Sequence, residues 1–124
     1  MMFKLEDILK LNNVLKTIID NDKLKINPSL KFKLLGIMKS LENPVMNFEI
    51  IRNEKIREYG KETENGNIEI PNDDSGKIEK FTNDLNEIMK TDIEINIQKL
   101  KLTDIFDKGL PADYLVGLYQ IIEE

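Results

Sequence analysis

The apolar positions of residues 5–20 recur every three or four residues, which is the spacing of one face of an α-helix. These positions are Leu5, Ile8, Leu11 or Leu15, Ile18 and Ile19. Glu6 and Asp7 fall in the first turn, where negative charge suits the helix dipole. The pattern therefore predicts a first helix that ends at the polar run starting with Asn21.

A second helical stretch begins at Asn27-Pro28, because asparagine caps free amides and proline is favoured at the first helical position. Its apolar face is Leu34, Ile37, Met38, Leu41, Val45 and Phe48. Pro44 interrupts this face, since proline removes one backbone hydrogen bond and clashes with the preceding turn. We expect helices over 28–42 and 44–59, nearly continuous, with Pro44 either kinking one helix or separating two.

Two shorter apolar patterns predict helices in the second half of the chain. The first has Ile78, Phe81, Leu85 and Ile88 on one face, and its cap is expected from Asp73, Asp74 or Ser75. The second opens at Pro111, with Leu115, Leu118, Tyr119 and Ile122 on one face. Gly117 is expected to weaken this last helix.

Strict alternation predicts strands at two places. Residues 67–70 follow the tight-turn pair Asn65-Gly66 and end at Pro71. Residues 92–99 alternate most clearly, with three isoleucines on one side and polar residues on the other. We expect this strand to end or bulge near Lys99.

Together these elements predict an α+β fold that is mainly helical, with an antiparallel helical hairpin, a two-strand element and covering helices. The length of 124 residues indicates a single domain, 1–124. Its first part, 1–60, is expected to hold the helical hairpin. Its second part, 61–124, is expected to run strand, helix, strand, helix.

Composition narrows the chemistry. The chain has no cysteine, histidine or tryptophan, so thiol chemistry, disulfides and the commonest neutral-pH base and metal ligand are missing. We expect no signal peptide at the start of the chain, because Glu6 and Asp7 stand where an apolar stretch is needed. No apolar run approaches the roughly 20 residues of a membrane span. We expect a cytoplasmic protein without membrane contact.

The net charge of −5 is unevenly distributed. Residues 1–40 carry eight Lys/Arg against four Asp/Glu, a net +4, and residues 41–124 carry ten against nineteen, a net −9. The acidic part argues against general nucleic-acid binding, which needs a basic footprint. The basic part suits a small anion or an acidic surface of a partner.

The acidic run 61–76 invites comparison with a calcium-binding EF-hand loop. If Gly66 takes the sixth position, Lys61 stands at the first ligand position and Asn72 at the twelfth, where a bidentate glutamate belongs. The run therefore predicts a solvated turn and a helix start, with no metal site. The other carboxylates show no catalytic setting, and no glycine-rich phosphate loop is present. We expect no enzymatic activity and no cofactor.

Four lysines flank the start of the second helix: Lys23, Lys25, Lys31 and Lys33. A helix N-terminus attracts anions through its free amides, and nearby lysines add long-range attraction. These lysines are the candidate site for a phosphate-bearing ligand or an acidic partner; the alternative is an ordinary solvated face. Several apolar residues also lie off the main helix faces, and their joint exposure would favour a homo-oligomer. They are Leu11, Val14, Ile50, Ile51 and Ile56.

The order of segments resembles a group of small phage- and prophage-encoded proteins of low-GC Gram-positive bacteria. The segments are the Lys-flanked junction "KLKINPSLKFKLLGIMKSLE", the helix end "NEKIREYG", the acidic "ETENGNIEIP", "FTNDLNEIM", "DIEINIQKLKLTDI" and "LPADYLVGL". Pro44, and Leu110 in place of a capping serine, depart from that pattern. The resemblance implies a phage accessory protein in the host bacterial cytoplasm, and it supplies no catalytic residues.

The expected function is stoichiometric binding that blocks or sequesters a host protein, such as a defence protein, or a small anionic signal. The alternative is a helper in virion or tail assembly that binds other phage proteins.

Overall fold

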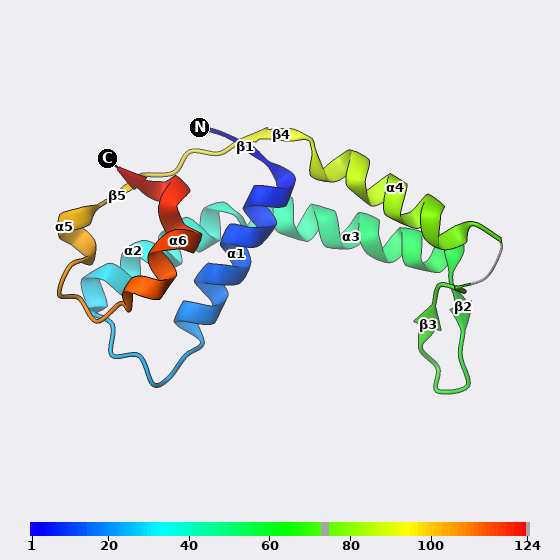
Figure 1. The fold of residues 1–124 in the computed structure, drawn as a ribbon, viewed down its shortest axis with the longest axis horizontal. Helices are drawn as coiled ribbons and strands as arrows, with labels where there is room; N and C mark the ends of the chain where they lie inside the picture. Colours follow the sequence, from blue (N-terminus) through cyan, green and yellow to red (C-terminus); the bar gives the residue numbers. More distant parts are fainter. Residues whose placement is uncertain (73–74, 124) are drawn as a thin grey trace.

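The computed structural model describes residues 1–72 and 75–123, and the chain has the mainly helical α+β fold that the sequence predicts. The α-helices are α1 (Leu5–Ile19), α2 (Pro28–Ser40), α3 (Glu42–Tyr59), α4 (Lys77–Met89), α5 (Leu102–Ile105) and α6 (Leu115–Leu118). The 3₁₀ helices η1 (Ala112–Tyr114) and η2 (Tyr119–Ile121) flank α6. Figure 1 shows a broad body at one end and a narrow extension at the other. We call residues 1–41 and 92–123 the head, and residues 42–72 and 75–91 the arm.

Short strands form three pairs. β1 (Met2–Lys4) pairs antiparallel with β4 (Asp92–Glu94), and β2 (Lys61–Glu62) pairs antiparallel with β3 (Ile68–Glu69). β5 (Leu100–Lys101) pairs with β6 (Ile122–Glu123) in parallel. The first and third pairs bring the two ends of the chain onto the run 92–101 in the head.

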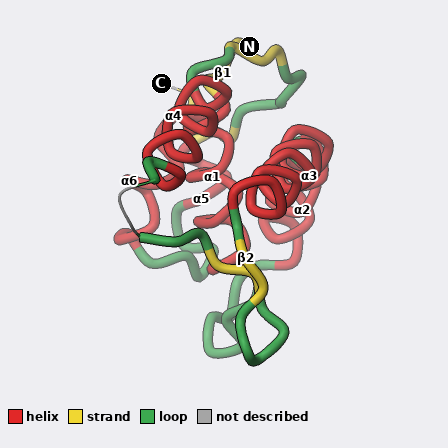
Figure 2. The backbone as a smooth tube through the Cα atoms, turned by 90° about the vertical axis from the view of Figure 1, so that its right-hand side faces the viewer, coloured by secondary structure: helices red, strands yellow, loops and turns green. Residues whose placement is uncertain are grey.

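Pro44 stands after a break between two helices. α2 ends at Ser40 and α3 begins at Glu42, so Pro44 lies in the first turn of α3, where a missing N–H costs little. The Val45 N–H donates to the Leu41 carbonyl at 3.2 Å, which keeps the junction tight. The two helices consequently run end to end (Figure 1), and Figure 2 shows them in line when viewed along the molecule.

The head contains the main hydrophobic core, in which α1 and α2 pack against each other. A loop over residues 20–27 joins the two helices. The predicted face of α1 is confirmed, because Leu5, Ile8, Leu11, Leu15 and Ile18 are buried. Side chains from α2, the run 93–100 and the C-terminal turns complete this core. They include Leu30, Leu34, Ile37, Leu41, Ile95, Ile97, Leu100, Leu118 and Ile121.

The arm has a far smaller core, in which α4 lies along α3 (Figure 1). Among the described residues, its buried members are Phe48 and Leu85 of the arm together with Leu5 of the head, and Phe81 and Ile88 are among the half-buried side chains beside them. α3 ends before residue 60 in the sequence and α4 begins after it. Their contact therefore joins the first part of the chain, 1–60, to the second part, 61–124.

A cluster of polar side chains connects α3 to α4 further along the arm. The Tyr59 hydroxyl donates to the Asp84 carboxylate at 2.7 Å, and this hydrogen bond raises the pKa of Tyr59. Lys55 Nζ lies 2.9 Å from Glu58 and 3.8 Å from Asp84. The hydrogen bond to Glu58 raises the pKa of Lys55. The Tyr-Gly end of the long helix thus has a structural role.

The acidic run 61–76 contains the β2–β3 hairpin that projects from the arm (Figure 2). Gly66 makes the turn with φ +79°, and the Thr63 N–H donates to the Asn67 carbonyl at 2.6 Å. α4 then begins at Lys77, with Gly76 rather than a polar side chain at the cap position. The expected caps Asp73 and Asp74 lie outside the described residues.

The single strand predicted over 92–99 is wrong in its extent. β4 ends at Glu94 and β5 begins at Leu100, and residues 95–99 belong to no strand. The side-chain alternation nevertheless continues, because Ile95 and Ile97 are buried while Asn96 and Gln98 are exposed. The strand pairing stops because β1 and β6 supply partners only at the two ends of the run.

The C-terminal helix is also shorter than predicted, because it breaks into η1, α6 and η2. Leu118 is buried as expected, but Tyr119 is 68% exposed and Ile121 takes the inward position. A Cβ on Gly117 would lie 2.8 Å from Val14 Cγ2, so glycine lets α6 approach α1 closely. The glycine that weakens this helix therefore also permits its packing.

The off-face apolar residues have mixed positions. Leu11 is buried in the head, Val14 packs against the core, and Ile51 and Ile56 are half-buried. Ile50 is exposed, and so are Phe32 and Leu35 on α2 and Met46 on α3. In residues 1–72 and 75–123, no helix has the length and apolar character to cross a membrane.

Candidate functional site

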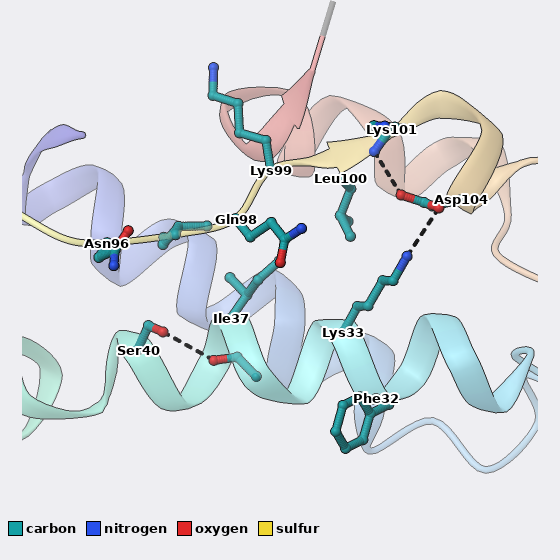
Figure 3. A pocket seen from close by; sticks show the side chains of 12 residues that line it. Phe32, Lys33, Ile37, Ser40, Asn96, Gln98, Lys99, Leu100, Lys101 and Asp104 are labelled. Carbon is teal, nitrogen blue, oxygen red and sulfur yellow. Dashed lines mark hydrogen bonds and ion pairs between the residues drawn. The ribbon is translucent and has the colours of Figure 1, made fainter.

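A cleft of about 660 Å³ lies in the head between α2 and residues 96–101 (Figure 3). This volume is within the usual range of ligand sites, roughly 300–1,000 Å³. One wall is helical, and the other is the unpaired part of the run 92–101. The lining residues are Phe32, Lys33, Gly36, Ile37, Ser40, Asn96, Ile97, Gln98, Lys99, Leu100, Lys101 and Asp104.

The helical wall is fixed by the cap at the start of α2. The Asn27 side-chain oxygen accepts hydrogen bonds from the Ser29 N–H at 2.9 Å and the Leu30 N–H at 3.4 Å. Pro28 occupies the first helical position, as the sequence predicts. Because the asparagine already holds these two amides, the attraction for an anion at this end depends mainly on the lysines.

The extended wall is anchored at both ends. On one side the Ile95 N–H donates to the Met1 carbonyl at 2.9 Å, and the terminal amine donates to the Ile95 carbonyl at 3.2 Å. On the other side Leu100 pairs with Ile122 in the parallel ladder. Buried Ile95, Ile97 and Leu100 hold the segment against the core.

An ion pair closes one end of the cleft. Lys33 Nζ lies 3.0 Å from Asp104 Oδ1, and the Lys101 backbone N–H donates to Asp104 Oδ2 at 3.0 Å (Figure 3). The Lys101 hydrogen bond, followed by the Lys33 interaction, lowers the pKa of Asp104. Asp104 therefore stays ionised at neutral pH and links α5 to α2. Both side chains keep some exposure, 44% for Lys33 and 27% for Asp104, so a ligand can reach the pair.

The four predicted lysines are dispersed around this cleft. Lys33 lines it, whereas Lys31 is exposed on α2 outside it. Lys23 and Lys25 are exposed in the loop before α2, and the Lys25 carbonyl packs against Gly109. The structure thus places one of the four in the cleft.

Two further lysines complete the cleft lining. Lys99 and Lys101 enter from the end of the isoleucine-rich run, and the sequence reading did not select them. Their position after Ile97, the last alternating isoleucine, could be read from the sequence. Only the fold reveals that this run faces α2. Three lysines thus stand among the lining residues against one aspartate. Lys33 is paired with Asp104, and Figure 3 shows the Lys99 side chain directed away from α2.

The polar groups of the cleft lining are lysines, amides, one serine and one carboxylate, and the Ser40 hydroxyl donates to the Gly36 carbonyl of its own helix. A nucleophile aligned with a base, as covalent catalysis needs, is not found in this lining. Across residues 1–72 and 75–123, His, Cys, Asp and Glu side chains form no group that could hold a metal ion.

Two other clefts are mainly apolar. One, of about 340 Å³, lies where the head meets the arm, beside Leu5, Phe48 and Ile93. The other, of about 670 Å³, lies along α1, α2 and α3 beside Leu35, Met38 and Met46. We favour the α2 cleft because it alone among these three combines a lysine excess with an ion pair and an unpaired stretch of backbone.

Comparison of the chain with protein-family models, with curated proteins and with solved structures finds no match, so the site is interpreted from its own residues.

Proposed function

We propose that the protein acts by stoichiometric, non-catalytic binding, and that the α2 cleft holds an anionic ligand or an acidic surface of a partner protein. The excess of Lys33, Lys99 and Lys101 over Asp104 in the cleft lining is the observation that carries this proposal. A net positive charge around a concave site raises the local concentration of anions. Lys23, Lys25 and Lys31 lie outside the cleft and add long-range attraction.

The proposed setting is that of a phage accessory protein in the host bacterial cytoplasm. The target would be a host protein, such as a defence protein, or a small anionic signal. The support for this setting is the order of segments along the chain, and binding by the cleft stands as a separate part of the proposal.

Native mass spectrometry of the freshly purified protein, alone and with a panel of nucleotides, tests the small-anion form. We expect a complex with one anion per chain. Lys33→Gln combined with Lys99→Gln should weaken it about tenfold or more, because two of the attracting charges leave the lining. A protein that ignores the whole panel contradicts small-anion binding.

A matched double variant is the control. Lys23→Gln with Lys31→Gln removes the same charge from the same basic region but from outside the cleft. It should weaken binding only slightly, through the loss of long-range attraction. Equal losses in the two double variants would point to a diffuse basic face and would reject the cleft.

Assembly with other phage proteins is the second candidate function. The exposed apolar side chains along α2 and α3 favour it, since Phe32 is 78% exposed and Ile50 is 51% exposed. The exposure of these side chains also supports the proposal that the protein forms a homo-oligomer. Phe32→Ser with Ile50→Ser should convert an oligomer to a monomer in light scattering after size exclusion. A wild-type monomer that also fails to capture a virion protein contradicts both ideas.

A further inference from the structure

We propose that the partner enters the α2 cleft as an extended, acidic peptide segment that adds a strand to residues 94–98. This inference rests on the proposed function, because it names the partner class for the same cleft. Three observations carry it: the unpaired backbone of the extended wall, the alternation of its side chains, and the charge of the lining.

The backbone groups of residues 96–98 are the first observation. Among the described residues, these three have no backbone hydrogen bond outside the strand ladders, and no ladder includes them. A stretch of free N–H and C=O groups is a template for another strand. The stretch is also held in place at both ends, so a partner strand would meet an ordered edge.

The direction of these groups follows from the β1–β4 pair. The N–H and C=O of Ile95 both bond to Met1, so they point toward β1. Successive residues of an extended chain point their backbone groups to opposite edges. The groups of Glu94, Asn96 and Gln98 consequently point to the edge away from β1. Figure 3 places residues 96–101 across the cleft from α2.

The side chains leave room for a partner strand. Ile95 and Ile97 point into the core, and Asn96 and Gln98 are exposed, so no large apolar group blocks the free edge. On the opposite wall Gly36 has open space where a Cβ would stand, with nothing within 4 Å. Beside Ile37 this opening suits an apolar side chain of the incoming peptide.

The charge of the lining selects the peptide. Lys99 and Lys101 follow directly after the free edge, with the Lys99 side chain directed away from α2. Lys33 lies at the end of the cleft, where it pairs with Asp104. A segment that alternates acidic and apolar residues would place its carboxylates near these lysines and its apolar side chains toward Ile37. Such alternation matches the strand period of two.

Fluorescence anisotropy with one defined probe tests this inference. The probe is a labelled seven-residue peptide of alternating glutamate and isoleucine, blocked at both ends. We expect saturable binding with one peptide per chain. The same peptide with lysine for glutamate should bind at least tenfold more weakly, because its charges repel those of the cleft.

N-methylation of alternate peptide amides isolates the backbone contribution. It removes the donors that face the edge of residues 94–98 and leaves the peptide's charges in place. We expect at least a tenfold loss, since each lost hydrogen bond alone accounts for roughly a threefold to tenfold change. Equal binding of the methylated and unmethylated peptides would overturn strand addition.

A pair of protein variants makes the same test from the other side. Gln98→Pro removes one N–H from the free edge, and an extended Ile97 tolerates a following proline. Gln98→Ala keeps that N–H and removes the side chain. The proline variant should bind about threefold to tenfold more weakly than the alanine variant, with circular dichroism confirming that both fold. Equal affinities would overturn the inference.

The outcomes separate this inference from the proposed function. Binding of nucleotides or peptide that needs Lys33 and Lys99 but ignores N-methylation and Gln98→Pro leaves the anion site standing and rejects strand addition. Binding of neither nucleotides nor peptide rejects both. If the protein self-associates and loses peptide binding as its concentration rises, a second copy of the chain takes the place of the peptide. The acidic β2–β3 hairpin of that copy would then be the added strand, and the inference of a separate peptide partner would be overturned.

Discussion

The head and the arm both bury apolar side chains, but the head buries more of them and from more elements. In the head, α1 and α2 enclose a core to which both ends of the chain contribute, and Ile8, Leu15 and Leu34 are completely buried. In the arm, α3 and α4 meet along one seam, where even Leu85 keeps 9% of its surface exposed. A side chain needs neighbours on several sides to be buried, and two helices alone do not provide them.

This difference bears on function. The α2 cleft lies in the head, so its walls stand on the best-packed part of the molecule. For the proposed partner, such a support would hold the lysines and the free backbone edge in position. The arm joins the head through α3, directly after α2, and none of its described residues lines the cleft.

Truncation of one leucine in each region should give the largest contrast. Leu34→Ala leaves a cavity among completely buried neighbours, and we expect a loss of about 2–5 kcal/mol in the free energy of unfolding. Leu85→Ala should cost about 1–2 kcal/mol, because its site is shallower and can collapse. Urea denaturation measures both. Equal costs would show that the arm core is as tightly packed as that of the head.

Two glycines with the same backbone conformation sharpen the contrast at a smaller scale. Gly109 in the head has φ +86°, and a Cβ there would contact the Lys25 backbone. Gly66 in the arm has φ +79° but open space around it. Gly66→Ala should cost about 1 kcal/mol from the left-handed conformation alone, and Gly109→Ala about 3 kcal/mol or more because a backbone must also move. Thermal unfolding measures the two losses, and a reversed order would contradict the packing described around Lys25.

The same contrast explains which features the sequence could predict. α1 to α4 were predictable because their apolar spacing or their caps are local signals, such as Asn27-Pro28 before α2. The end of the strand at Glu94 was not predictable, since it depends on where β1 supplies a partner from the far end of the chain. Lys33 was found from its place near a helix start. Lys99, Lys101 and Asp104 were missed because only the tertiary fold brings α5 and residues 96–101 opposite α2.

The responses to pH should also differ, because the two regions are held by groups with opposite pKa shifts. The pKa of Asp104 in the head is lowered from 3.8, so its contribution is present at higher pH and is lost as the pH falls through the folded value. The pKa of Tyr59 in the arm is raised from 10.0 by its hydrogen bond to Asp84. Its contribution is present below pH 10.0 and is lost as the pH rises through the higher folded value.

We therefore expect the cleft end of the head to loosen first in acid and the arm to loosen first in alkali. Both groups are partly exposed to solvent, so the changes in stability should be small and local. Nuclear magnetic resonance titration of the Tyr59 ring and the Asp104 carboxyl measures them directly. Asp84→Asn should bring the pKa of Tyr59 down by removing the acceptor charge, and it should leave the Asp104 titration unchanged because Asp84 lies in the arm. A shift of both titrations in this variant would show that the head and the arm are electrostatically coupled, and their independence would be disproved.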